Sequence, residues 1–580
     1  MSDSNPAPQS PVRQSPVRQS PVSWNSRQYS APSADREVLC EPSDGDVRSL
    51  IDRTQSTLDS VDCCLCDEPL SRVRTQARQE ILAEAARYTE QVRGVPVPPP
   101  GEGPLVVTGH QPELYHPGVW LKNFAASKIS GAIGGLALNV IVDTDLCDEL
   151  AIPVLDQANE RPKFRTVAID EPDRQSPWED LRIKSPAILP AAGEQIRRTM
   201  SQWDIEPIAA DHWFDAPQVQ TGDCLVEHLT RLRHNRQQAW DAPLLELPMR
   251  RLCRLPSYAL FVCHVLRNID RLQAVYNEGL ATYRRLNGLR SAGHPMPDLG
   301  AVTVDGRQRR EAPLWVWRAG DVKRRPIWIE QLGCSFRLYD VRDDDHENAE
   351  CVGVIRRTDC AADAWHKLLI DLDQQGIRIR PRALMTTLFL RLCVADLFIH
   401  GIGGAKYDEV TDHLFREFVG SEAPGFLTIS GTLRLPIPRH TASAADETRL
   451  KSLLWDLRHN ADRHGIGADE LIARKRQLVA EQQAAEADAA AGRPRSPREN
   501  YDRFTALKAV ADELAERASR QIESVATELA TVRHQLAENK LLASREFSWV
   551  LYPEDLLREW LHEASDRITA SVTQRPVETS

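Results

Sequence analysis

The chain has 580 residues, 42% hydrophobic and 27% charged, and is therefore long enough for two to four units with their own cores. Its formal net charge of −11 argues against a nucleic-acid-binding protein, because non-specific affinity for phosphate backbones depends on surplus Lys and Arg. No apolar run approaches the roughly 18 residues of a membrane span, and no apolar secretory segment opens the chain, so we expect a cytoplasmic protein with no nucleic acid and no membrane as partners.

The first 38 residues contain a five-residue repeat, QSPVR QSPVR QSPVS, from Gln9 to Ser23. Proline at every fifth position removes the hydrogen bonds of helices and strands, and the few apolar residues cannot offset the entropy cost of ordering the chain. We therefore predict a disordered arm over residues 1–38.

Apolar residues recur at helical spacing in the next segment, which predicts a helical lead-in over residues 39–97. This segment contains Cys63, Cys64 and Cys66, while the other cysteines are scattered. No second cysteine pair or histidine pair follows at a zinc-like spacing, so we expect reduced thiols and no metal site.

One strand–helix–strand unit stands out in the sequence. Pro104 to Thr108 predicts a buried strand, Pro117 to Ser130 a helix with proline in its first turn, and Ala137 to Val142 a second buried strand. Because such a unit is the building block of a parallel sheet, we predict an α/β core over residues 98–436, with an insertion at about 151–345.

Within that insertion, APLWVWRAGDVKRRPIWIE (312–330) has two arms rich in Trp and Ile around a Gly-Asp turn, which predicts a β-hairpin. The strand-and-helix pattern then returns. We predict a strand from Ala395 to His400, a turn from Gly401 to Gly404 and a helix from Tyr407 to Phe418, and expect them to complete the sheet.

The composition changes to Ala, Glu, Arg and Gln after Pro438. Apolar residues from Leu507 to Leu536 recur every three or four positions, which predicts a helical hairpin or coiled coil over 437–549, followed by a closing segment and tail over 550–580. An unpaired helix would leave its apolar stripe in water, so the stripe must meet either the other arm of the hairpin or a second chain.

Gly109, His110 and His116 follow the first predicted strand and precede a helix. Ligands collect at the carboxyl ends of parallel strands, where Gly109 would allow close approach and the two histidines would donate to a phosphate or an oxyanion. In the structural alternative, His110 caps the strand and His116 caps the helix through its backbone.

Asp143 and Asp145, with Asp148 and Glu149 nearby, follow the second strand of the unit. Carboxylates at this edge of a sheet hold an amine, a ribose hydroxyl or a Mg²⁺ that accompanies phosphates. The alternative is helix capping by Asp145 and a solvated loop. The sequence leaves both alternatives open.

The turn at Gly401, Gly403 and Gly404 lies between a strand and a helix, as phosphate-binding turns do, with Lys406 just beyond it. It lacks the glycine spacing of a dinucleotide-binding turn and that of a P-loop. A tight structural turn is the alternative interpretation.

Three stretches, in this order, resemble the bacillithiol-biosynthesis cysteine-adding enzymes, a family of cysteine ligases. LVVTGHQPELYHPGVWLKNFAA resembles the family's strand, TGQQ-type loop and helix start; ALNVIVDTDLCDE resembles its acidic strand end; and ADLFIHGIGGAKYDEVTDHLFREF resembles its YVGGPGE-type turn and following helix. The resemblance covers about residues 98–560.

The resemblance implies a Rossmann-like core of the nucleotidyl-transfer type, a coiled coil that supports a homodimer, and condensation of a cysteine carboxylate with an amino-sugar conjugate. His110 and His116 would then stabilise the negative charge of a phosphate or an oxyanion, and Asp143 and Asp145 would orient the amine. The implied binding residues are Gly109, Gln111, Gly118, Gly401, Gly403, Gly404 and Lys406, with ATP and Mg²⁺ as the candidate cofactor. A relative that kept the fold as a non-catalytic ligand-binding or scaffolding dimer is the alternative.

Overall fold

The computed structural model describes most of the chain beyond the N-terminal repeat. The described residues are 24, 29–42, 47–97, 101–157, 161–172, 175–210, 219–291, 293, 296–333, 335–356, 362–494 and 496–573. Of the arm predicted to be disordered, residues 1–23 and 25–28 lie outside them. Residues 29–38 are described, however, and lie against the body, where Thr432 Oγ1 donates to the carbonyl of Pro32 (2.7 Å).

A six-stranded, mostly parallel sheet forms the centre of the body, which confirms the predicted α/β class. Its spatial order is β1 (Val38–Glu41), β16 (Phe426–Gly431), β15 (Leu397–His400), β4 (Leu105–His110), β5 (Leu136–Ile141) and β8 (Leu245–Pro248). Only the edge strand β1 runs antiparallel to its neighbour. Along the chain the sheet grows from β4 through β5 to β8, and then on the other side of β4 through β15 and β16, so the direction of growth reverses between β4 and β15.

The predicted strand–helix–strand unit is confirmed as β4, α3 (Pro117–Ile133) and β5. Pro117 occupies the first turn of α3, and Gly134, in the left-handed region at φ 71°, ends it. The predicted insertion at about 151–345 contains a strand of this sheet, β8. β8 has only four residues, too few to show the alternating or continuous apolar pattern from which a strand is predicted.

Helices cover both faces of the sheet, because successive side chains of a buried strand point to opposite faces. Val106 of β4 joins a core with Trp120 of α3 and Trp560 of α16 (Glu554–Thr573). Leu105 and Val107 join a second core with α2 (Leu70–Arg93), α7 (Pro256–Arg267) and α10 (Ala383–Cys393). The predicted helical lead-in thus consists mainly of α1 (Val47–Ser60) and α2, with the short strand pair β2 (Cys64–Leu65) and β3 (Glu68–Pro69) between them.

The segment between β5 and α10 carries most of the remaining elements of the body. Before β8 lie β6 (Ala151–Asp156), β7 (Lys163–Ala168), α4 (Ile188–Met200) and α5 (Leu225–Ala239); after it come α6 (Met249–Leu252), α7 and α8 (Ile269–Leu286). A second, antiparallel sheet follows, formed by β9 (Ala301–Val304), β10 (Arg307–Arg318), β11 (Arg325–Leu332), β12 (Ser335–Asp340), β13 (Glu350–Arg356) and β14 (Ile377–Pro381). Helix α9 (Ala362–Gln374) connects β13 to β14. The pairing of β10 with β11 confirms the predicted hairpin.

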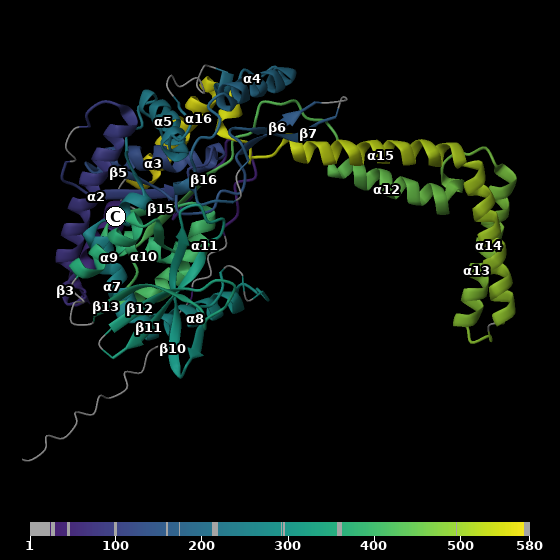
Figure 1. Ribbon diagram of the computed structural model, residues 1–580. Coiled ribbons are helices and arrows are strands. Elements are labelled where there is room, and N and C mark those ends of the chain that lie inside the picture. Colours follow the sequence, from purple (N-terminus) through teal and green to yellow (C-terminus); the bar gives the residue numbers. More distant parts are fainter. Residues whose placement is uncertain are drawn as a thin grey trace, which may run out of the picture.

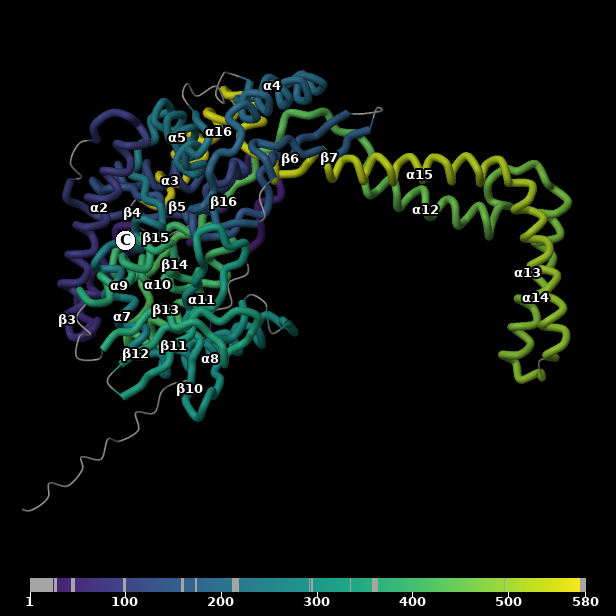
Figure 2. Tube along the Cα trace, in the orientation of Figure 1, coloured from purple at the N-terminus to yellow at the C-terminus, as the bar shows by residue number. Residues whose placement is uncertain are grey.

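A long helical arm projects from the body (Figure 1). Its helices are α12 (Ala444–His459), α13 (Asp469–Ala490), α14 (Pro497–Arg517) and α15 (Ser519–Leu542). The chain runs out along α12 and α13 and returns along α14 and α15, so that α12 packs on α15 and α13 on α14 (Figure 2). Within the described residues, no helix is both long and apolar enough to cross a membrane.

Candidate functional site

A cavity of about 480 Å³ lies at the carboxyl ends of β4 and β15, where the direction of sheet growth reverses. Adjacent loops diverge at such a point, which leaves a crevice for a ligand. Nine residues proposed from the sequence line this cavity: Gly109, His110, Gln111, His116, Gly118, Asp145, Gly401, Gly403 and Gly404. The histidine turn and the glycine turn, almost 300 residues apart, thus open into one space, which we call the switch cavity.

His116 caps helix α3 with its side chain. Its Nδ1 accepts a hydrogen bond from the backbone N–H of Gly118 (3.1 Å), and its Nε2 lies 3.3 Å from the guanidinium of Arg545. Burial and the nearby Arg545 and Lys122 lower the pKa of His116 to about 3. Burial, with Lys122 next in importance, likewise lowers the pKa of His110 to about 3. Both histidines therefore act as neutral hydrogen-bonding groups at neutral pH.

Lys122, which was not singled out in the sequence, brings a positive charge to the switch cavity. It projects from α3, is only 3% exposed, and donates to the carbonyl oxygen of Gly109 (2.7 Å). Among the described residues no carboxylate pairs with it, and burial lowers its pKa to about 8. The sequence does contain a signal for this residue: α3 is apolar on nearly all its faces, and a lysine is unusual in such a helix.

Arg545 reaches the same cavity from the segment that returns from the arm. Its guanidinium donates to Ser430 Oγ (3.1 Å) and Thr432 Oγ1 (3.3 Å), beside His116. Its carboxylate partner is the adjacent, exposed Glu546 (3.2 Å). No local pattern around Arg545 marks it as a site residue, because its position depends on where the arm rejoins the body.

The glycines at 401, 403 and 404 form the first turn of α11 (Ile402–Leu414) and its N-cap, instead of the separate turn that was predicted. No described side chain caps this end of α11, so its first backbone N–H groups are open toward the switch cavity. A Cβ on Gly403 would meet nothing within 4 Å. The turn therefore leaves room for an anionic group to approach the helix end.

His400, at the end of β15, is the third histidine of the switch cavity. It is buried, and its Nε2 donates to Asp408 Oδ2 of α11 (2.9 Å), a carboxylate that also binds the buried Arg391. Nε2 faces Asp408, and the other ring nitrogen, Nδ1, is turned toward Gly404, 2.8 Å from where a Cβ on that residue would stand. A carboxylate thus orients a proton acceptor at this cavity.

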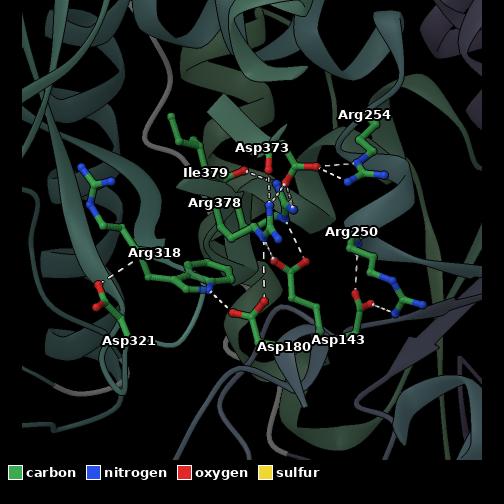
Figure 3. A network of polar contacts seen from close by, with 12 residues as sticks. Asp143, Asp180, Arg250, Arg254, Arg318, Asp321, Asp373, Arg378 and Ile379 are labelled. Atoms are coloured by element: carbon green, nitrogen blue, oxygen red, sulfur yellow. Dashed lines mark hydrogen bonds and ion pairs between the residues drawn. The ribbon is translucent and has the colours of Figure 1, made fainter. Parts of the chain in front are cut away.

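The two aspartates that were expected to orient the amine lie in different environments. Asp145 lines the switch cavity, where Gln111 and Arg324 (2.6 Å) hold its carboxylate. Asp143 does not line it: its fully buried carboxylate accepts from the backbone N–H of Arg250 (3.0 Å) and from its guanidinium (2.5 Å) (Figure 3). Asp143 thus belongs to a buried ion pair with Arg250 and lies outside the wall of the switch cavity.

Of three further proposed residues, Lys406 lies outside the cavity wall, and the two glycines that line it, Gly109 and Gly118, are also required by backbone packing. Lys406 lies beyond the first turn of α11 and does not line the cavity. A Cβ on Gly118 would collide with the carbonyl oxygen of Gly431, and one on Gly109 would lie 2.8 Å from the carbonyl oxygen of Val140. Close packing of backbone on backbone explains these two glycines without a ligand.

The switch cavity supplies groups that suit a phosphate or a carboxylate: Lys122, Arg545, two neutral histidines and an open helix end. The described residues contain no group of three or more His, Cys, Asp or Glu side chains that could hold a metal ion. Comparison of the sequence with models of known protein families and with curated proteins finds no match. The chemistry of the site is therefore argued from its geometry.

Proposed function

We propose that this protein is a carbon–nitrogen ligase of the cysteine-adding type with a Rossmann-like core. It would bind an amino-acid carboxylate, or its activated phosphoryl derivative, in the switch cavity and join it to a small amine. The observation that carries the proposal is the buried Lys122, which faces the cavity without an acidic partner among the described residues, beside the open N-terminus of α11. Uncompensated positive charge in a cavity favours an anionic ligand.

Each group of the cavity suits a part of this reaction. A free carboxylate forms an amide only after activation, so the acyl carbon must carry a phosphate or adenylate leaving group. Lys122 and Arg545 would stabilise the negative charge on that group as it departs with the bonding electrons. As the amine nitrogen attacks the acyl carbon, His400 would accept its proton at Nδ1, and Asp408 would stabilise the resulting imidazolium.

A second candidate, a scaffolding dimer without catalysis, is favoured by the arm. Trp455, Tyr501 and Phe504 on its helices are 59%, 69% and 65% exposed, as is common for a surface that meets another chain. The two candidates differ in whether the switch cavity binds a substrate.

Isothermal titration with ATP and Mg²⁺, with cysteine and with glucosaminyl malate tests the proposal. We expect ATP or cysteine to bind, and Lys122→Met to weaken that binding at least tenfold. Lys128→Met is the matched control, because Lys128 projects from the same helix toward Asp566 (3.0 Å) and should not affect affinity. Absence of binding by all three compounds would leave the scaffolding dimer as the better account.

A further inference from the structure

A second cavity, of about 460 Å³, adjoins the switch cavity. We call it the side cavity. The two share His110, Gln111, His116, Val119 and Glu546, so the loop between β4 and α3 forms a wall of both. A molecule in the side cavity would therefore lie next to a ligand in the switch cavity.

The two cavities differ in charge. Glu113, Glu149 and Glu546 line the side cavity, whereas no Lys or Arg does. Its two histidines, His110 and His116, stay neutral because burial holds their pKa values near 3. The switch cavity, in contrast, has Lys122 and Arg545 in its wall, and its two carboxylates, Asp145 and Glu546, are each paired with an arginine. An anion is therefore repelled from the side cavity and a cation is attracted.

Glu113 is a carboxylate in the wall of the side cavity that lacks a positively charged partner in the part of the chain that the structure describes. Its side chain is partly buried, and among the described residues it makes neither a hydrogen bond nor an ion pair. Burial, together with the charges of Asp148 and Asp145, raises its pKa, as expected of a carboxylate that lacks a counter-charge. A bound ammonium group would supply that charge.

The rest of the wall suits a small organic amine better than a bare ion. Leu114, Tyr115 and Ile152 give apolar surface, and the indole Nε1 of Trp178, a residue 2% exposed, has no hydrogen-bond partner among the described residues. Such a mixture of apolar walls and a few unsatisfied polar groups is typical of small-molecule sites.

We infer that the side cavity binds the primary ammonium group of a small amine, with Glu113 as its counter-charge. This assignment rests on the proposed function: the side cavity is the subsite of the amine that is to be acylated, the role that the sequence interpretation gave to Asp143 and Asp145.

Titration of the full chain with D-glucosamine at pH 6.5 tests this inference, with N-acetyl-D-glucosamine as the uncharged counterpart. We expect the amine to bind and the acetylated sugar to bind at least tenfold more weakly. Glu113→Gln should weaken glucosamine binding by a similar factor, whereas Asp148→Asn, which removes a nearby carboxylate outside the wall, should change it less than twofold. Equal affinity for the two sugars, no binding of either, or unchanged glucosamine binding by Glu113→Gln would each overturn the inference.

A crossed measurement separates this inference from the proposed function. Inorganic pyrophosphate serves as the anionic probe of the switch cavity. Lys122→Met should weaken pyrophosphate binding and leave glucosamine binding unchanged, while Glu113→Gln should do the opposite. Glucosamine binding that depends on Glu113, without any pyrophosphate binding, would refute the proposed role of the switch cavity and still support the amine site. The reverse result would refute the amine site alone.

Discussion

Two buried charges near the switch cavity show how differently single residues can be satisfied. Asp143 is fully buried and paired with Arg250, whereas Lys122 is buried with only a backbone carbonyl as partner. Removing one member of a buried ion pair destabilises the fold, because the other charge then stays buried without a partner. A buried charge that has no partner already lowers stability, so a function other than stability explains its presence. This contrast separates a structural residue from a candidate site residue.

Lys122→Met should change how stability depends on pH. The pKa of Lys122 is about 8 in the folded protein against an ordinary 10.5, so the folded state loses this proton first as the pH rises. The free energy of unfolding of the wild type should therefore increase between about pH 8 and 10.5, by about 3 kcal/mol. Subtracting the curve of Lys122→Met, measured by chemical denaturation at several pH values, should isolate this increase. Parallel curves for the two proteins would contradict the assigned cost of burial.

Asp143→Asn should destabilise the fold instead of affecting catalysis alone. The substitution leaves the Arg250 guanidinium partly buried without its carboxylate, which costs about 3–5 kcal/mol for a buried pair. Thermal unfolding followed by circular dichroism should show a clear drop in melting temperature. Asp148→Asn, five residues away and exposed, is the control and should melt with the wild type. Equal melting of Asp143→Asn and the wild type would restore Asp143 as a candidate for the chemistry.

At the scale of elements, the glycines of α3 and α11 have different tasks. Gly118→Ala should cost roughly 1–3 kcal/mol, because the added methyl group collides with the Gly431 carbonyl and pushes α3 from β16. Gly403→Ala should keep or slightly raise the melting temperature, since its Cβ meets nothing within 4 Å, and yet weaken ligand binding because it narrows the switch cavity. Thermal melting combined with titration of each variant would distinguish packing from ligand approach. The assignment fails if both variants melt alike.

The sequence predicted elements well where a local pattern contained the information. β4, α3 and β5 were predictable from one apolar run, a helix with proline in its first turn and a second apolar run. β8 was missed because four residues carry no period, and the boundary at Gly401 was misplaced because glycines inside the first helical turn read as a loop. Lys122 was visible as a lysine in a buried helix. Arg545 was not, because only the return of the arm places it beside His116.

At the scale of the whole molecule, the chain that returns from the arm also forms part of the wall of the switch cavity. The chain leaves the body toward α12, returns through α15, and delivers Arg545 and Glu546 to the switch cavity only a few residues after α15 ends. The outgoing and returning segments of the arm are joined at its base, since His440 and Asn539 of α15 exchange two hydrogen bonds of 2.9 Å. A partner that held the arm would therefore also restrain the segment that carries Arg545.

We expect two chains to associate through the arm. The helices of the arm pair with one another, and this pairing leaves Trp455, Tyr501 and Phe504 largely exposed. Light scattering coupled to size-exclusion chromatography should give a mass near twice 65.2 kDa, and Trp455→Glu with Phe504→Glu should reduce it to one chain, because burying two new carboxylates opposes contact. Val354→Glu is the control, since this exposed residue lies on β13 of the body. A single-chain mass for the wild type would show that the arm's own pairing suffices, and a two-chain mass for the double variant would place the interface elsewhere.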